Sequence, residues 1–330
     1  MRPGAQMSPV AVVAVGGNAL TTPHQRGTAA EIETNAAEMA ACLAELVGDG
    51  WSVAVVHGNG PQVGNLALQQ DEGLRLVPGQ PMYALCAMTQ GQLGSVLVRA
   101  IDAHCGPGAA VALVTHVTVD PADPALLHPT KPIGPFFTAE RAAELAVQRG
   151  WQVAEDAGRG HRRVVASPQP TGVLELPAIS TLLAAGHVVL AAGGGGIAVT
   201  AGADGRFRGV EAIVDKDLAA TGLAIALGAR DLYLLTGVDH VQLDFGTPRQ
   251  RPAYRLSVAE AHGHLADGQF PAGSMGPKVA AALQFLAAGG GRAIITSPEL
   301  LADAAAGVPG VGTVLVADEA AADRDRPAVA

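Results

Sequence analysis

Residues 10–20 read VAVVAVGGNAL, in which six consecutive apolar residues run directly into a pair of glycines. A continuous Val-rich run of this length predicts a strand that is buried on both faces, as in a parallel sheet covered by helices. Similar apolar runs recur along the chain at residues 51–56, 109–119, 187–192, 231–236, 292–296 and 313–317. We therefore interpret residues 10–15 as the first strand of an α/β fold.

Helical patterns separate these predicted strands. TAAE (28–31) and SVAE (257–260) are capping boxes, and the first of them opens a predicted helix that runs to about Val47. Further helices are expected at about 82–104 and 216–227, and from 278 to about 288. Strands that alternate with helices predict a mainly parallel open sheet with helices on both faces.

The regular alternation is interrupted between about residues 120 and 177. This segment is rich in proline, glycine and charged residues, and only about 138–149 has a convincing helical pattern. We expect an inserted subdomain that projects from the main body. Alternation then resumes, and Asp204-Gly205 predicts a hairpin turn.

Composition excludes several classes of protein. The net charge of −9 and the 3% of aromatic residues disfavour nucleic-acid binding, and no apolar run reaches the roughly 18 residues of a membrane span. The first residues lack the apolar core of a signal peptide, and the three cysteines have no metal or redox spacing, so a cytoplasmic location is expected. The ten histidines form no ligand pair, so we expect no metal site made of protein ligands.

Four glycine-rich turns follow predicted strands: GGNAL (16–20), HGNGPQVG (57–64), GGGG (193–196) and TGVD (236–239). Glycine lets the backbone approach a ligand closely, and the amino end of a following helix offers N–H groups to an anion. One such turn is more often structural than functional. Because ligands bind at the carboxyl ends of parallel strands, four of them together favour a phosphate or carboxylate site.

The chain contains 18 arginines but only three lysines: Lys131, Lys216 and Lys278. A lysine ammonium is a compact point charge, whereas a guanidinium is a broad planar fork, so only lysine suits a tight loop around a phosphoryl group. A single surface lysine needs no functional explanation. All three lie beside Gly, Pro or Asp in stiff loops, which favours a shared role in phosphoryl transfer, where positioned positive charge matters more than a covalent nucleophile.

Two aspartates, Asp215 and Asp217, flank Lys216. Either of them can be explained as an acidic residue that complements the dipole at the start of a helix. The alternative is that one carboxylate orients the ammonium groups.

These motifs together resemble the carbamate kinases of the amino-acid kinase superfamily. The resemblance runs from about residue 10 to 317 and rests on the following stretches: AVGGNAL, HGNGPQVG, PTKPIGPF, EDAGRGHRRVVASPQP, AAGGGGI, VDKDLA and GSMGPKV. It implies a three-layer αβα sandwich with a small protruding subdomain, a homodimer, and reversible phosphoryl transfer between ATP and carbamate, used mostly to form ATP from carbamoyl phosphate and ADP. Gln169 stands where the family commonly has lysine, which weakens any phosphate-binding role at that position.

The resemblance also implies an organisation into lobes. Residues 1–225 would form a lobe for carbamate or carbamoyl phosphate, interrupted by the subdomain, and residues 226–330 would form a nucleotide-binding lobe. ATP or ADP would bind with Mg²⁺ held mainly by the nucleotide phosphates.

Residue roles follow from the same resemblance. Lys216 and Lys278 would neutralise the transferring phosphoryl group, Asp217 would hold these lysines, and Lys131 would reach the carbamoyl phosphate from the subdomain. The phosphoryl and carbamate groups would be bound by Gly16, Gly17, Asn18, Gly58, Asn59, Gly60, Gly194 and Gly195. The nucleotide pocket would be lined by Thr236, Gly237, Val238, Asp239, Met275 and Gly276.

Two other functions remain open at this point. Another acylphosphate-forming kinase, such as an acetylglutamate kinase, would use a similar site, although the Lys131 motif argues against it. A non-catalytic nucleotide-binding protein would be expected to have lost one of the phosphate-side charges, and here all three lysines and Asp217 are present.

Overall fold

An eight-stranded sheet forms the centre of the protein. The computed structural model describes residues 8–22, 25–156, 158–271 and 274–317. In the sheet, all neighbouring strands are parallel except β16 and β17, which confirms the predicted mainly parallel sheet. In spatial order its strands are β15 (Arg255–Ser257), β17 (Thr313–Val316), β16 (Arg292–Thr296), β12 (Asp231–Leu235), β1 (Val10–Val15), β2 (Ser52–His57), β9 (Val188–Leu190) and β3 (Ala110–Ala112).

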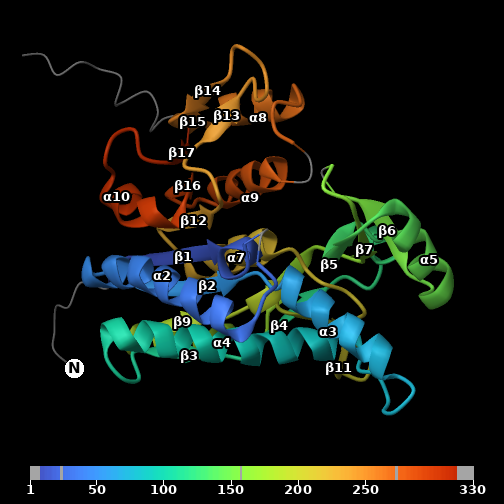
Figure 1. Cartoon of the computed structure of the whole chain (residues 1–330). Helices are drawn as coiled ribbons and strands as arrows, with labels where there is room; N and C mark the ends of the chain where they lie inside the picture. Colours follow the sequence, from blue (N-terminus) through green and yellow to red (C-terminus); the bar gives the residue numbers. More distant parts are fainter. Residues whose placement is uncertain (1–7, 23–24, 157, 272–273, 318–330) are drawn as a thin grey trace, which may run out of the picture.

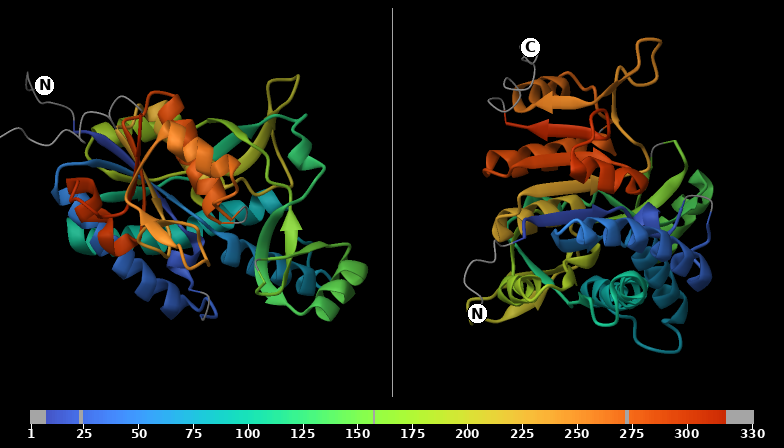
Figure 2. Two further views of the ribbon diagram at one scale, coloured as in Figure 1. Left: turned by 90° about the horizontal axis from the view of Figure 1, so that it is seen from above. Right: turned by 90° about the vertical axis from the view of Figure 1, so that its left-hand side faces the viewer.

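Helices cover both faces of this sheet (Figures 1 and 2). One face packs against α2 (Ala29–Gly48), α4 (Met82–Cys105) and α10 (Leu301–Ala306). The opposite face packs against α6 (Leu176–Ala184), α7 (Lys216–Leu227) and α9 (Met275–Ala287). The predicted three-layer αβα sandwich is therefore confirmed.

Strand β1 is apolar at every position because both of its faces are buried. Val13 belongs to the core beneath α2 and α4, whereas its neighbour Val12 belongs to the core beneath α7 and α9. Side chains alternate between the two faces of a strand, so both faces of a sheet covered on both sides must be apolar.

The predicted single strand at residues 109–119 is wrong. The structure divides it into β3, in the main sheet, and β4 (His116–Val119), which joins a four-stranded sheet with the order β11-β10-β4-β8. The break lies at Thr115, whose N–H donates to the Gln90 side chain at 2.8 Å while its carbonyl accepts from the same amide at 3.1 Å. The same carbonyl also accepts the N–H of Ile197, the first residue of β10, at 2.9 Å, so Gln90 and the second sheet together hold the chain at the point where it changes sheets.

The other strands of that sheet are β10 (Ile197–Ala201), β11 (Phe207–Gly209) and β8 (Pro170–Val173). β10 and β11 form the hairpin predicted at Asp204-Gly205. The remaining elements of the main body are α1 (Gly17–Leu20), α3 (Gly60–Gly73), α8 (Val258–Ala266), the β13–β14 hairpin (Val241–Leu243 and Arg251–Ala253) and three short 3₁₀ helices at Pro124–Leu126, Gly193–Gly195 and Pro298–Leu300.

A small subdomain projects from the main body, shown in green in Figure 1. It contains the sheet β5-β7-β6 and one helix, whose bounds are β5 (Lys131–Phe137), α5 (Ala139–Arg149), β6 (Gln152–Glu155) and β7 (His161–Val165). The predicted segment 120–177 is longer, because its last strand, β8, returns to pair with β4. The predicted lobe boundary at residue 225 falls inside α7, and the main sheet continues across it, so the division into lobes stays a prediction.

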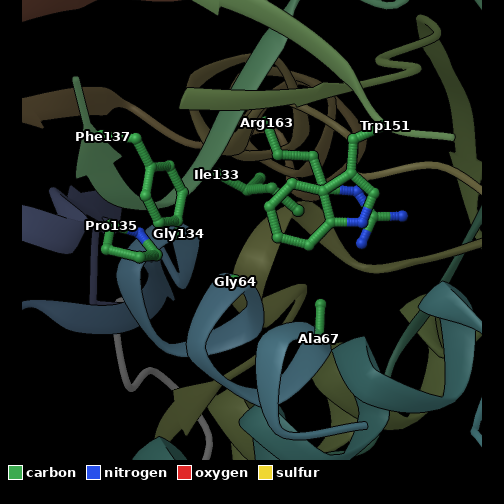
Figure 3. A pocket seen from close by; sticks show the side chains of 8 residues that line it. All are labelled: Gly64, Ala67, Ile133, Gly134, Pro135, Phe137, Trp151 and Arg163. Atoms are coloured by element: carbon green, nitrogen blue, oxygen red, sulfur yellow. The ribbon is translucent and has the colours of Figure 1, made fainter. Parts of the chain in front are cut away.

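The subdomain is joined closely to helix α3. A side chain at Gly64 would lie 2.0 Å from the backbone of Gly134, so two glycines allow α3 and β5 to touch. Trp151 and Arg163 line a small pocket beside this contact (Figure 3). The guanidinium carbon of Arg163 lies 5.1 Å from the centre of the Trp151 ring. The pocket therefore belongs to the joint between subdomain and body.

A buried ion pair lies at the amino end of the central strand β12. Asp231 is fully buried, accepts hydrogen bonds from Nε and Nη2 of the Arg292 guanidinium, and accepts another from the Tyr233 hydroxyl at 3.1 Å. Replacing Asp231 by alanine leaves the Arg292 charge buried without its partner. We expect the free energy of unfolding to fall by about 3–5 kcal/mol, as measured by urea denaturation.

The matched control for this prediction is Asp204→Ala. Asp204 pairs with Arg208 on an exposed hairpin, where an ion pair contributes about 0–1 kcal/mol. Equal losses in the two variants would show that burial of the Asp231 pair adds nothing to stability.

Candidate active site

The order of the strands reverses at β1, between β2 and β12. From β1 the chain continues to β2 on one side, and it later returns to β12 on the other side of β1. The point where strand order reverses in an open α/β sheet is where ligands bind. The first glycine turn follows β1 and the fourth follows β12, so both lie at this point.

Asp217 and two lysines form the centre of the site. Asp217, in the first turn of α7, has one carboxylate oxygen 2.5 Å from Lys216 Nζ and the other 3.0 Å from Lys278 Nζ. Lys278 comes from the first turn of α9, and its ammonium also lies 3.5 Å from the carbonyl oxygen of Leu235, the last residue of β12. The cluster therefore lies at the carboxyl edge of the sheet.

The third lysine reaches the same place from the subdomain. Lys131, the first residue of β5, forms an ion pair with Asp215. Asp215 is the N-cap of α7, and its other carboxylate oxygen accepts a hydrogen bond from the N–H of Asp217 at 2.8 Å. Three lysines that are scattered over the sequence thus meet around two carboxylates at the start of one helix.

Burial and the opposing charges act together on the ionisation of this cluster. Burial would raise the pKa of Asp217, but the two ammonium groups hold it well below its usual range. Burial would likewise lower the pKa of Lys216, and its attraction to Asp217 and Asp215 raises it instead. For Lys278, burial and the nearby Lys216 outweigh the attraction of Asp217 and lower the pKa to about 8.

The lowered pKa of Lys278 predicts a pH dependence. In the free protein this ammonium loses its proton as the pH rises through about 8, and with it the charge that attracts phosphate. Because bound phosphate favours the charged form, the pKa rises in the complex. We expect kcat/KM for an anionic phosphoryl substrate to fall above about pH 8, and the fall in kcat to begin at a distinctly higher pH.

The experiment is a pH–rate profile from pH 6 to 10 with enzyme stability checked at each pH. Superimposable profiles of kcat and kcat/KM would contradict the prediction, because they would mean that substrate binding leaves the titrating group unchanged.

The glycine turns after β1 and β2 lie together. The N–H of Gly58 donates to the carbonyl oxygen of Val15 at 2.8 Å, which joins the second turn to the end of β1. Helix α3 begins at Gly60, and no side chain in the described part of the chain caps its amino end. The N–H groups of its first turn, except at Pro61, which has none, are therefore available to an anion. Gly17 and Asn18 begin the short helix α1, and the side chain of Asn18 lies outside the described part of the structure.

Packing explains the third glycine turn. A side chain at Gly194 would lie 2.2 Å from Asn59 Nδ2, and one at Gly195 would lie 2.1 Å from the carbonyl oxygen of Val214. Both glycines also have φ values in the left-handed region, 68° and 90°. Their absence of side chains is thus required by the fold, whether or not their backbone binds a substrate.

The predicted nucleotide residues lie around the ends of β12 and α9. Thr236 directly follows β12 and is held by a hydrogen bond from its N–H to the carbonyl oxygen of Thr296 at 2.9 Å. Gly237, Val238 and Asp239 are exposed, Gly276 is buried, and Met275 is half-buried at the start of α9. They are on the Lys278 side of the cluster, and their contact with a nucleotide remains a prediction.

Two residues of α4 that were not predicted from the sequence, Thr89 and Gln90, hold the glycine turns in place, and the side chain of the predicted site residue Asn59 is buried against the first of them. Asn59 donates to the Thr89 hydroxyl at 2.9 Å, and Gln90 donates to the carbonyl oxygen of Gly193 at 2.9 Å. Together they join the second and third glycine turns to one helix. The available signal was two adjacent polar residues within an otherwise apolar helical face, and that pattern alone does not identify their partners.

The site does not resemble a metal centre. Within the described residues there is no group of three or more His, Cys, Asp or Glu side chains that could hold a metal ion. The carboxylate oxygens of Asp215 and Asp217 already contact lysines and a helix N–H. In this arrangement the two carboxylates act as partners of ammonium groups. Among the described helices, none is long and apolar enough to cross a membrane.

Comparison with known proteins gives a consistent result. Residues 9–297 match the model of the amino acid kinase family. The chain is 42% identical to the carbamate kinase of Pyrococcus horikoshii over 305 residues, which cover 91% of this chain and 97% of that protein. The carbamate kinase from Giardia lamblia bound to citric acid superimposes with a TM-score of 0.89 at 36% identity, covering 94% of this chain and 99% of that one. The same Giardia enzyme bound to AMP-PNP superimposes with a TM-score of 0.84 at 36% identity, over 94% and 99% of the two chains.

Proposed function

The chain belongs to the amino acid kinase family, and within it to the carbamate kinases, so we propose that its lysine cluster transfers a phosphoryl group between carbamoyl phosphate and ADP. The observation that carries this proposal is the meeting of Lys131, Lys216 and Lys278 around two carboxylates at the carboxyl edge of the sheet. The three ammonium groups exceed the two carboxylates by one charge. The excess positive charge suits a substrate that carries several negative charges.

In the direction of ATP formation, a terminal phosphate oxygen of ADP attacks the phosphorus of carbamoyl phosphate. The bond from phosphorus to the carbamate oxygen breaks, and carbamate leaves with the electron pair. The transition state of such a transfer is loose and spreads negative charge over the phosphoryl oxygens, so preorganised positive charge is the main requirement. Lys216 and Lys278 supply this charge from the body, and Lys131 supplies it from the subdomain.

The two carboxylates hold the lysine ammonium groups in position before the substrate binds. Asp217 is 6% exposed and touches both Lys216 and Lys278, so these ammonium groups need little reorganisation when phosphate binds. The glycine turns after β1 and β2 would bind the phosphoryl and carbamate oxygens through backbone N–H groups. The turn after β12, with Met275, would hold the nucleotide.

Magnesium is assigned to the phosphates of the nucleotide. It would supply further charge neutralisation there.

A homodimer in the cytoplasm is the expected form of the enzyme, and size-exclusion chromatography with light scattering measures the dimer directly.

A coupled assay tests the proposal. Carbamoyl phosphate and MgADP should give ATP, followed through a hexokinase couple, whereas N-acetylglutamate and MgATP should give no ADP above the background. ADP formation with N-acetylglutamate and no ATP from carbamoyl phosphate would contradict the proposal and favour an acetylglutamate kinase. Tight binding of ADP without turnover of any acyl phosphate would favour a non-catalytic protein.

A further inference from the structure

Asp215 has two separate contacts, one through each carboxylate oxygen. Oδ1 accepts the N–H of Asp217 at 2.8 Å and so caps helix α7. Oδ2 forms the ion pair with Lys131, which is 84 positions earlier in the chain and belongs to the protruding subdomain. A cap alone does not need the second contact, since serine, threonine or asparagine caps a helix equally well.

The backbone brings these two residues together. Lys131 in β5 is paired with Val165 in β7. The next residue, Ala166, accepts a hydrogen bond at 2.9 Å from the N–H of Ile213, two residues before Asp215. The inner end of the subdomain sheet is therefore anchored to the segment that leads into α7, and Lys131 is carried to the helix start.

The side chains are sheltered from water. Lys131 and Asp215 are each about one-quarter exposed, with side-chain exposures of 24% and 25%. Burial and the nearby Asp217 would raise the pKa of Asp215, but the ammonium groups of Lys131 and Lys216 together outweigh them, and the pKa lies below its ordinary value. An ion pair in this environment is less screened by salt than one at the surface.

We propose that Asp215 is a positioning residue, which latches the subdomain at the phosphoryl site by holding the Lys131 ammonium beside the amino end of α7. This proposal rests on the proposed function for its kinetic consequences, but the latch itself is a property of the free protein. Asp215 acts on substrate through Lys131 and not by touching the reacting atoms. Its loss should therefore weaken the use of carbamoyl phosphate and leave the nucleotide side unaffected.

The key variant is Asp215→Asn, because asparagine keeps the helix cap and removes the charge. We expect kcat/KM for carbamoyl phosphate to fall by about tenfold, mainly through KM, with KM for MgADP within about twofold of the unchanged protein. In a Lys131→Met background the same substitution should change kcat/KM by less than about twofold, because the partner is already absent. Asp204→Asn, which removes a carboxylate from an exposed ion pair, should have no effect.

A second measurement needs no activity. Hydrogen exchange of the backbone amides in β5 and β7 should become at least about threefold faster in Asp215→Asn than in the unchanged protein, because the latched end of the sheet opens more often. Asp215→Ala should show the same exchange and additionally a lower unfolding temperature, because it also removes the cap.

The outcomes separate the two proposals. If the unchanged protein forms no ATP but exchange in β5 and β7 is faster in Asp215→Asn, the latch stands and the proposed function fails. The latch is overturned if exchange is unchanged, if the tenfold loss persists in the Lys131→Met background, or if Asp215→Asn lowers KM for carbamoyl phosphate. In the last case Asp215 would be competing with substrate for Lys131.

Discussion

Replacing Lys278 by arginine is expected to lower kcat for ATP formation by about 100- to 1,000-fold while the protein stays folded. Lys278 is 9% exposed, and its ammonium is enclosed by Asp217, Lys216 and the end of β12. The planar guanidinium is larger and keeps its charge in a fixed fork, so it cannot occupy the same point between carboxylate and phosphoryl group. Conservation of charge alone is therefore not enough at this position.

Steady-state kinetics and the unfolding temperature together test this expectation. The matched control is Arg99→Lys, an exchange between the same two residue types at an exposed ion pair with Glu33, which should leave kcat unchanged. If kcat of Lys278→Arg is within about threefold of that of the unchanged protein, the claim that this position requires a lysine and not an arginine is contradicted. Lys216→Arg is expected to behave in the same way, because Lys216 contacts the same carboxylate.

Replacing Asp217 by asparagine is the second change with a large expected effect. Asparagine has nearly the same shape but leaves Lys216 and Lys278 facing each other without the negative charge between them. The pKa of Lys278, already lowered to about 8, should fall further, so the alkaline limb of kcat/KM should move to lower pH. We expect kcat/KM at pH 7.5 to fall by about 100-fold or more.

The same substitution should also lower the free energy of unfolding by about 3 kcal/mol, because it removes one partner from a buried charge cluster. Urea denaturation measures this change, and Asp204→Asn at the exposed hairpin is the control. An alkaline limb at the same pH as in the unchanged protein would show that Asp217 does not set the ionisation of Lys278.

The sequence was sufficient for those elements that depend on local pattern. The run at residues 10–15 had to be apolar on both faces, and the glycine turns had to lie at one edge once the strands were parallel. The break at Thr115 could not be predicted, because it depends on contacts with residues far away in the sequence: the Gln90 side chain, 25 positions earlier, and the N–H of Ile197 in the second sheet. Apolar alternation is the same in both halves of that predicted strand.

The site shows the same limit. The scarcity of lysine identified the three cationic residues, and the structure brings all three together. The pairing of Lys131 with Asp215 depends on how the subdomain packs against α7. The residues next to either of them in the sequence carry no information about that contact. Asp215 could equally have been only a cap, and its pairing with Lys131 became visible only in three dimensions.

The central claim is that three lysine ammonium groups converge on the phosphoryl group in transfer. The most direct measurement is a crystal structure with carbamate, MgADP and aluminium fluoride, a mimic of the transferring group. We expect Nζ of Lys131, Lys216 and Lys278 to lie within about 3.2 Å of its fluorine or oxygen atoms. A mimic bound in the site with one or more of these ammonium groups turned away into solvent would contradict the account.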